Sequence, residues 1–238
     1  MTHDPLSEDR RRMLIALLGA SAAAGASTNL HAQGLLGSVP QPLSPGRSFY
    51  RITGSVGVDG TAATFGTMVR PGSVVETGEN SEAIFAVASH AMLLRSNSRV
   101  VIEGDPLATV IAGLRLVGKL LSVSRNANLR LQTPTLTAGI RGTGWYAEAD
   151  PDLTYFCTCY GDVDLVASDD PASHESVSSK QHDRPLYIAR EAAEGEHIRN
   201  APFINHTDQE LALIEAIVGR EPPFVFPREI YNTPRRTY

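Results

Sequence analysis

The sequence predicts an all-β fold, a turn-rich sandwich or solenoid-like stack of short antiparallel strands, with one short helix near the C-terminus. From residue 49 onward, short segments rich in Val, Ile, Thr and aromatic residues alternate with turn residues. The 238 residues include 20 Gly and 15 Pro, which supply many turns. Short strands at close, regular spacing are typical of this fold class, and no long helical pattern interrupts them.

The individual strands are predicted from β-type composition and from alternation. In residues 128–132 the side chains alternate between apolar and polar, so Leu129 and Leu131 are expected to face a core while Arg130 faces water. Turn residues such as Pro71 and Gly72 separate the strands. The predicted strands include residues 81–88, 91–95, 99–103, 116–124, 128–132, 144–149 and 154–160.

The first residues have the three parts of a secretory signal. The basic run 10–12 precedes the apolar run 13–18, and small residues follow to position 26. Cleavage is expected after Ala32, and the arginines resemble a twin-arginine signal, which exports folded proteins. The alternative is an uncleaved membrane anchor, although the apolar run is shorter than the roughly 20 residues that a spanning helix needs.

The rest of the chain divides by composition. Pro, Gly and Ser dominate residues 33–48, which are expected to form a linker. The β-type pattern then continues to residue 166. The predicted organisation is therefore a signal peptide (1–32), a linker (33–48), a β domain (49–166) and a C-terminal part (167–238) that holds a loop, an added strand, the helix and a docking tail.

The C-terminal part begins with the polar residues 167–181, which are predicted to form a loop, and residues 186–188 are predicted to add a strand. Thr207 and Glu210 have the spacing of a capping box at the start of the helix, and Gly219 is expected to end it. The apolar helix face comprises Leu211, Ile214, Ile217 and Val218, and Phe224 and Phe226 are expected to pin the tail.

Composition narrows the class of partner. The formal net charge is -5 and the positive charges are not clustered, which argues against nucleic acid as a partner. After the signal peptide, no apolar run is long enough to cross a membrane. We therefore expect an exported protein of the periplasm, with a protein partner in the cell envelope.

Residues 69–166 resemble the FecR domain family. The resemblance lies in the segments 69–83, 114–120, 133–146 and 161–165, together with Leu93, Ser98 and Val100 in the strand pair that follows the first. The most specific segment is Thr133–Tyr146 with its Thr-Pro and its Arg-Gly-Thr corner. The resemblance implies an all-β domain of the cell envelope, in a family named for regulators that relay iron-siderophore signals to a sigma factor. Those regulators carry a cytoplasmic region and a spanning helix before this domain, whereas nine residues precede the arginines here.

The resemblance therefore implies a non-enzymatic binding, sensing or scaffold module. A further alternative is the receptor half of an iron-responsive signalling system, with a partner chain that supplies the cytoplasmic half.

Cys157 and Cys159 are the two cysteines of the chain. On a strand, residues i and i+2 share one face at a Cα separation of roughly 6.5–7 Å, which is at the limit for a relaxed disulfide. With His182 and His206, the two thiolates could instead bind zinc or iron, and Asp183 would be the partner that orients a histidine. Three interpretations stay open: a metal site, a strained or redox-active disulfide, and two small buried thiols.

The other histidines carry less information. His174 and His197 are expected in solvent and His90 in a hairpin turn. Ser178, His182 and Asp183 could be written as a triad, but no nucleophile elbow surrounds the serine. We therefore expect no enzymatic activity.

Overall fold

The computed structural model describes residues 40–107, 110–124, 128–193 and 195–223. The predicted signal peptide (1–32), the first part of the predicted linker and the tail residues Phe224 and Phe226 lie outside the described residues.

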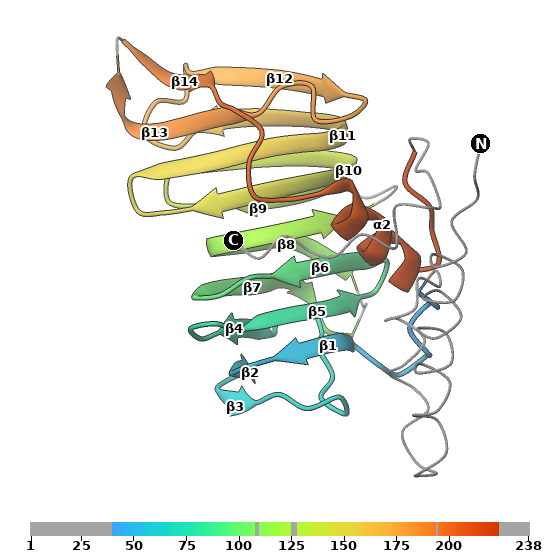
Figure 1. Ribbon diagram of the computed structural model, residues 1–238. Coiled ribbons are helices and arrows are strands. Elements are labelled where there is room, and N and C mark those ends of the chain that lie inside the picture. The colour runs from blue at the N-terminus through green and yellow to red at the C-terminus, as the bar shows by residue number, and fades with distance from the viewer. Residues whose placement is uncertain (1–39, 108–109, 125–127, 194, 224–238) are drawn as a thin grey trace, which may run out of the picture. The chain divides into compact units, whose positions relative to one another are not determined.

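The described chain folds into one 14-stranded sheet, mixed but largely antiparallel, with the short helix α2 (Asp208–Ile217) near its C-terminal end. Figure 1 shows the strands one above another, from β2 and β3 at one end to β13 and β14 at the other. The predicted all-β class is confirmed. The strands are β1 (Phe49–Thr53), β2 (Val56–Val58), β3 (Thr61–Ala62), β4 (Val74–Thr77), β5 (Glu82–Val87), β6 (His90–Leu94), β7 (Ser98–Asp105), β8 (Val110–Val123), β9 (Asn128–Gln132), β10 (Leu136–Ala149), β11 (Leu153–Ala167), β12 (His174–Ser179), β13 (Leu186–Ala193) and β14 (Glu196–Asn200).

Three long strands, β8, β10 and β11, divide the sheet into two layers because each changes partners halfway along. The second half of β8 pairs with β6 on one side and with the second half of β10 on the other, and the first half of β11 pairs with β13. Strand β6 in turn pairs with β5, and β5 pairs with β1. We call this layer A. The first half of β8 pairs with β7, the first half of β10 with β9, and the second half of β11 with β12. Strand β7 in turn pairs with β4, and β4 pairs with β2. We call this layer B.

Glycines stand where long strands pass from one layer to the other. Gly118 in β8 and Gly161 in β11 both have φ of +91°, a conformation that side-chain-bearing residues rarely adopt. A Cβ at Gly118 would overlap Ser98, and one at Gly161 would overlap Thr143. Composition predicted strands at 116–124, 144–149 and 154–160, and the resemblance placed strand segments at 114–120, 133–146 and 161–165. Neither predicted that these segments join into three long strands that pass from one layer to the other.

The two layers enclose an apolar cluster that we call the inner core. Leu129 and Leu131 face it, as their alternation predicted, and Trp145 stacks on Phe156 with ring centroids 5.9 Å apart. Its buried members also include Phe49, Val56, Val58, Val69, Val75, Ala83, Phe85, Val87, Met92, Leu94, Val100, Ile102, Ile111, Leu114, Leu116, Leu120, Leu136, Ala138, Ile140, Ala147, Ala149, Val163, Leu165, Ala167, Val177, Leu186 and Ile188.

A second apolar cluster, the outer cluster, lies on the opposite face of layer A. Helix α2 covers it beside β6 and β8 (Figure 1). The predicted capping box of Thr207 and Glu210 is present, and no described helix is long and apolar enough to cross a membrane. Its buried members are Ile84, Ala91, Leu93, Leu121, Val123, Tyr146, Tyr155, Cys157, Cys159, Tyr160, Leu211, Ile214 and Ile217.

Two local predictions are wrong. Residues 167–181 contain strand β12, which pairs with the second half of β11 and buries Val177 against the inner core. Its other side chains are all polar, and His174, Ser176 and Ser178 are exposed at the sheet edge, so composition alone predicted a loop. His90 does not lie in the hairpin turn: the turn is at Ala88 and Ser89, and His90 begins β6 as a buried residue.

Candidate metal centre

Cys157 and Cys159 lie on the layer A half of β11 and face the outer cluster. The intervening residue, Thr158, points to the opposite face, as expected for alternation along a strand. Cys157 is directly opposite Tyr146 of β10 in the antiparallel pairing. Both thiols are free and fully buried. The sequence therefore predicted correctly that the pair shares one face.

His182 comes from the connection between β12 and β13. Its backbone has a positive φ of +52°, and its N–H donates to the carbonyl of Cys159 at 2.9 Å. Asp183 holds the turn, because its carboxylate accepts hydrogen bonds from the backbone N–H of Lys180 at 2.6 Å and of Gln181 at 3.4 Å. This tight turn places the imidazole of His182 over the cysteine pair.

His206 comes from the stretch just before α2. Its Nδ1 lies 2.7 Å from the carbonyl oxygen of Ile204. A carbonyl only accepts, so Nδ1 carries a proton, and Nε2 is the nitrogen with a free lone pair. The ring stacks on Tyr146 with centroids 4.5 Å apart. Because Thr207 is the N-cap of α2, the helix start fixes the position of His206.

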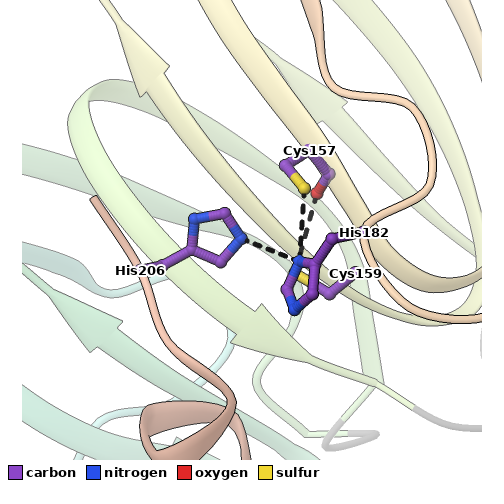
Figure 2. A group of neighbouring side chains, drawn as sticks. All are labelled: Cys157, Cys159, His182 and His206. Carbon is purple, nitrogen blue, oxygen red and sulfur yellow. Dashed lines mark hydrogen bonds between the residues drawn. The ribbon is translucent and has the colours of Figure 1, made fainter. Parts of the chain in front are cut away.

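The four predicted ligand residues converge. The two sulfurs and one nitrogen of each histidine all lie within 4.8 Å of one another. His206 Nε2 is 3.1 Å from His182 Nδ1, which is 3.4 Å from Cys157 Sγ (Figure 2). Tetrahedral zinc, with Zn–N of about 2.0–2.1 Å and Zn–S of about 2.3 Å, places its nitrogens roughly 3.3 Å apart and nitrogen and sulfur roughly 3.5 Å apart. The N–N and N–S separations given above, 3.1 and 3.4 Å, are close to those of that geometry.

Asp208, rather than Asp183, orients His182. Its Oδ1 lies 2.8 Å from His182 Nε2, which leaves Nδ1 directed at Cys157. Asp183 is occupied by the turn, so the predicted role for it is wrong. The sequence offered one signal for Asp208, which is an acidic residue in the first turn of the capped helix, two positions after His206. A carboxylate behind a ligating histidine is the usual outer partner in metal sites.

The site favours one thiolate. The pKa of Cys157 is lowered to about 4 by the hydrogen bond from Cys159 and, against the effect of burial, by the neighbouring histidines. Burial raises the pKa of Cys159 well above its usual value. Burial also acts to lower the pKa of His182, but Asp208 and Cys157 outweigh it and raise that pKa to about 9. Without a metal, the site therefore holds a thiolate beside an imidazolium.

Aromatic rings close the site. Phe203 lies with its ring centroid 4.5 Å from those of both His182 and His206, and half of its surface is exposed. The side chain of His182 is 10% exposed, and His206 is buried. The ring of Phe203 therefore separates the two imidazoles from solvent.

The remaining candidate residues lie elsewhere. His174 is exposed at the start of β12, as predicted, whereas His197 in β14 is half-buried and its Nδ1 lies 3.1 Å from the carbonyl of Ala189. Ser178 is exposed on β12. The ring of His182 is directed at Cys157 and Asp208, so the geometry brings no triad together around Ser178.

The chain matches no family model and no curated protein. Two crystal structures of a candidate anti-sigma factor from Parabacteroides distasonis ATCC 8503 are similar to it at 10% sequence identity, with TM-scores of 0.44 and 0.45. Each similarity covers 60% of this chain and 64% of the other, so less than two thirds of that protein's length is spanned. A similarity at this level identifies no function.

Proposed function

We propose that this protein is a non-enzymatic metal-binding module of the bacterial cell envelope, in which Cys157, Cys159, His182 and His206 bind one zinc ion. The convergence of four ligand atoms from three separate parts of the chain carries the proposal. Two sulfurs and two nitrogens in a closed arrangement suit zinc, with iron as the alternative metal.

The proposed role is non-enzymatic because the site offers four protein ligands. A catalytic zinc site keeps one position open for water or substrate, whereas a structural site takes four protein ligands. Here four ligand atoms lie within 4.8 Å of one another, and Phe203 packs against both imidazoles. The metal would therefore stabilise the fold or report on conditions, and it would not activate a substrate.

The proposed location rests on the sequence. The basic and apolar runs at the N-terminus favour export, and the resemblance of residues 69–166 to FecR domains supports a sensing or scaffold role with an envelope protein partner. Replacement of Arg10 and Arg11, the pair that the twin-arginine pattern aligns with Met13, by Lys should retain the protein in the cytoplasm. An unchanged distribution between cell fractions would contradict the twin-arginine route.

Metal analysis tests the proposed function. The full chain, purified from its native compartment or reconstituted with zinc under reducing conditions, should contain one zinc per chain. Cys157→Ser should lose it, and Thr158→Ser, on the same strand but the opposite face, should retain it. A parent protein that stays metal-free after reconstitution would refute the proposal, and stoichiometric iron after native purification would assign the site to iron.

A further inference from the structure

The four candidate ligands do not belong to one part of the fold. Cys157 and Cys159 are part of layer A, and His182 follows β12, but His206 belongs to residues 201–218, which we call the C-terminal segment. A metal bound by all four would therefore join the C-terminal segment to the sheet at the start of α2.

The C-terminal segment covers apolar surface. Leu211, Ile214 and Ile217 pack into the outer cluster and are fully buried. Beneath them lie side chains of layer A that include Leu93 and Leu121, each with no exposed surface. Detachment of α2 would expose this face of the sheet to water.

Apart from the metal site, polar contacts attach the C-terminal segment at separate points along its length. Asn205 donates to Glu148 at 2.7 Å, Gln181 donates to Asp208 at 2.7 Å, and the N–H groups of Leu43 and Ala201 pair with the carbonyls of Ile217 and Pro185 at 2.8 and 2.9 Å. Arg95 donates to the carbonyl of Asn205 at 2.7 Å and forms an ion pair with Glu210 at 3.0 Å. Tyr155 accepts a hydrogen bond from the N–H of Ile204 at 3.3 Å. Tyr160 donates to the buried carboxylate of Glu215.

The helix itself cannot persist when detached. It has ten residues, and isolated helices shorter than about 12–15 residues are marginal in water. Detachment would therefore cost helical structure as well as apolar contacts, so α2 and the stretch around His206 behave as one unit of local unfolding. A ligand that binds only the attached state shifts this equilibrium toward attachment.

We infer that metal occupancy fastens the C-terminal segment to layer A, so that loss of the metal releases the segment and uncovers the apolar outer face. The inference rests on the proposed function, because it assigns a consequence to metal binding at the same site. The chain then responds to metal through the exposure of one face, while the two-layer sheet stays intact.

Hydrogen–deuterium exchange of the full chain tests the inference. Peptides that cover residues 201–218 should exchange at least about tenfold faster after zinc is removed by a chelator under reducing conditions, while peptides of β7 and β9 in layer B stay unchanged. Equal exchange of residues 201–218 with and without bound zinc would overturn the inference and leave the proposed function standing. Failure to bind zinc at all would overturn both.

Two histidine variants form a matched pair, because each removes one imidazole ligand. His206→Ala removes the ligand of the C-terminal segment, so zinc held by the remaining three residues should no longer slow exchange in residues 208–218. His182→Ala keeps His206, so zinc should still slow it. Each variant is compared with itself at saturating zinc and without zinc. The same zinc response in both variants would contradict the fastening role of His206.

Discussion

The inner core and the outer cluster share layer A but are held together in different ways. Trp145 and Tyr146 are neighbours in sequence, yet Trp145 stacks on Phe156 between the two layers, whereas Tyr146 stacks on His206 beneath the C-terminal segment. The inner core is enclosed by two paired sheet layers. The outer cluster is covered by a ten-residue helix that polar contacts and the Cys–His group attach.

The two clusters are therefore expected to have different roles: the inner core stabilises the fold, and the outer cluster responds to the metal. The stability of the inner core depends on the apolar area buried between two layers of strands and requires no particular polar contact. A short helix on a sheet depends on particular contacts, so removal of one contact changes its attachment. The variants below are expected to act on one cluster or on the other.

The largest expected effect is on metal affinity. Cys159→Ser should weaken zinc binding by at least about a thousandfold, because it removes one of four ligands from a site where binding and local folding are coupled. Competition with a chromophoric chelator measures the change. Thr158→Ser, which faces the inner core side, should leave the affinity within about threefold of the parent. Comparable losses in both variants would mean that the strand, and not the thiol, determines binding.

Truncating one side chain in each cluster should distinguish the inner core from the outer cluster, because the loss of stability should depend on zinc only in the outer cluster. Leu131→Ala in the inner core should lower the free energy of unfolding by about 3 kcal/mol with or without zinc, because it leaves a cavity between fixed layers. Ile214→Ala in α2 should cost a similar amount with zinc bound but less than about 1 kcal/mol without it, because the helix then detaches before the sheet unfolds. Urea denaturation of both variants, with and without zinc, measures these losses. An equal loss for Ile214→Ala with and without zinc would mean that α2 stays attached when the metal is removed.

His90 provides a pH test at a buried residue opposite Val87, away from the ligands. Burial and, secondarily, the charge of Arg220 lower its pKa to about 4 from an ordinary value of 6.5. Below pH 6.5 His90 binds a proton in the unfolded chain but stays neutral in the folded chain. The free energy of unfolding that His90 contributes above pH 6.5 is therefore lost as the pH falls toward 4. Since one pKa unit corresponds to about 1.4 kcal/mol, the loss is up to about 3 kcal/mol.

His90→Leu should remove that dependence. Urea denaturation between pH 7 and 4.5, in chelator and reductant so that metal loss does not contribute, should show a flatter stability profile for the variant than for the parent. Parallel profiles would mean that His90 is protonated without cost in the folded protein.

The smallest expected effect is on the single tryptophan. Trp145 is fully buried in the inner core, on the face of layer A opposite the candidate metal site. Its fluorescence emission should therefore stay at the same wavelength when zinc is removed, although exchange in α2 accelerates. A red shift on metal removal would mean that the inner core also opens.

Much of the fold could be predicted because local patterns agree with the final packing. Leu129 and Leu131 alternate with polar residues and both face the inner core, and the capping box of Thr207 and Glu210 begins α2. The passage of β8 between layers was not predictable, because the predicted strand 116–124 runs through Gly118 and composition does not show the positive φ that Gly118 adopts there. Strand β12 was missed because one face of an edge strand holds polar side chains that resemble a loop.

The candidate site was predictable in its residues but not in its geometry. Alternation alone places Cys157 and Cys159 on one face. His182 and His206 lie 25 and 49 residues beyond Cys157, and only the return of the chain through β12, β13 and β14 brings them over β11. Asp208 was missed because its partner is defined by that return and not by local spacing.

X-ray absorption by the zinc-loaded full chain tests the central claim most directly. The account predicts a four-coordinate zinc with two sulfur atoms at about 2.3 Å and two nitrogen atoms at about 2.0–2.1 Å. Cys159→Ser should leave a single sulfur in that shell. A spectrum with only oxygen and nitrogen around the metal would show that the ion binds elsewhere and would contradict the account.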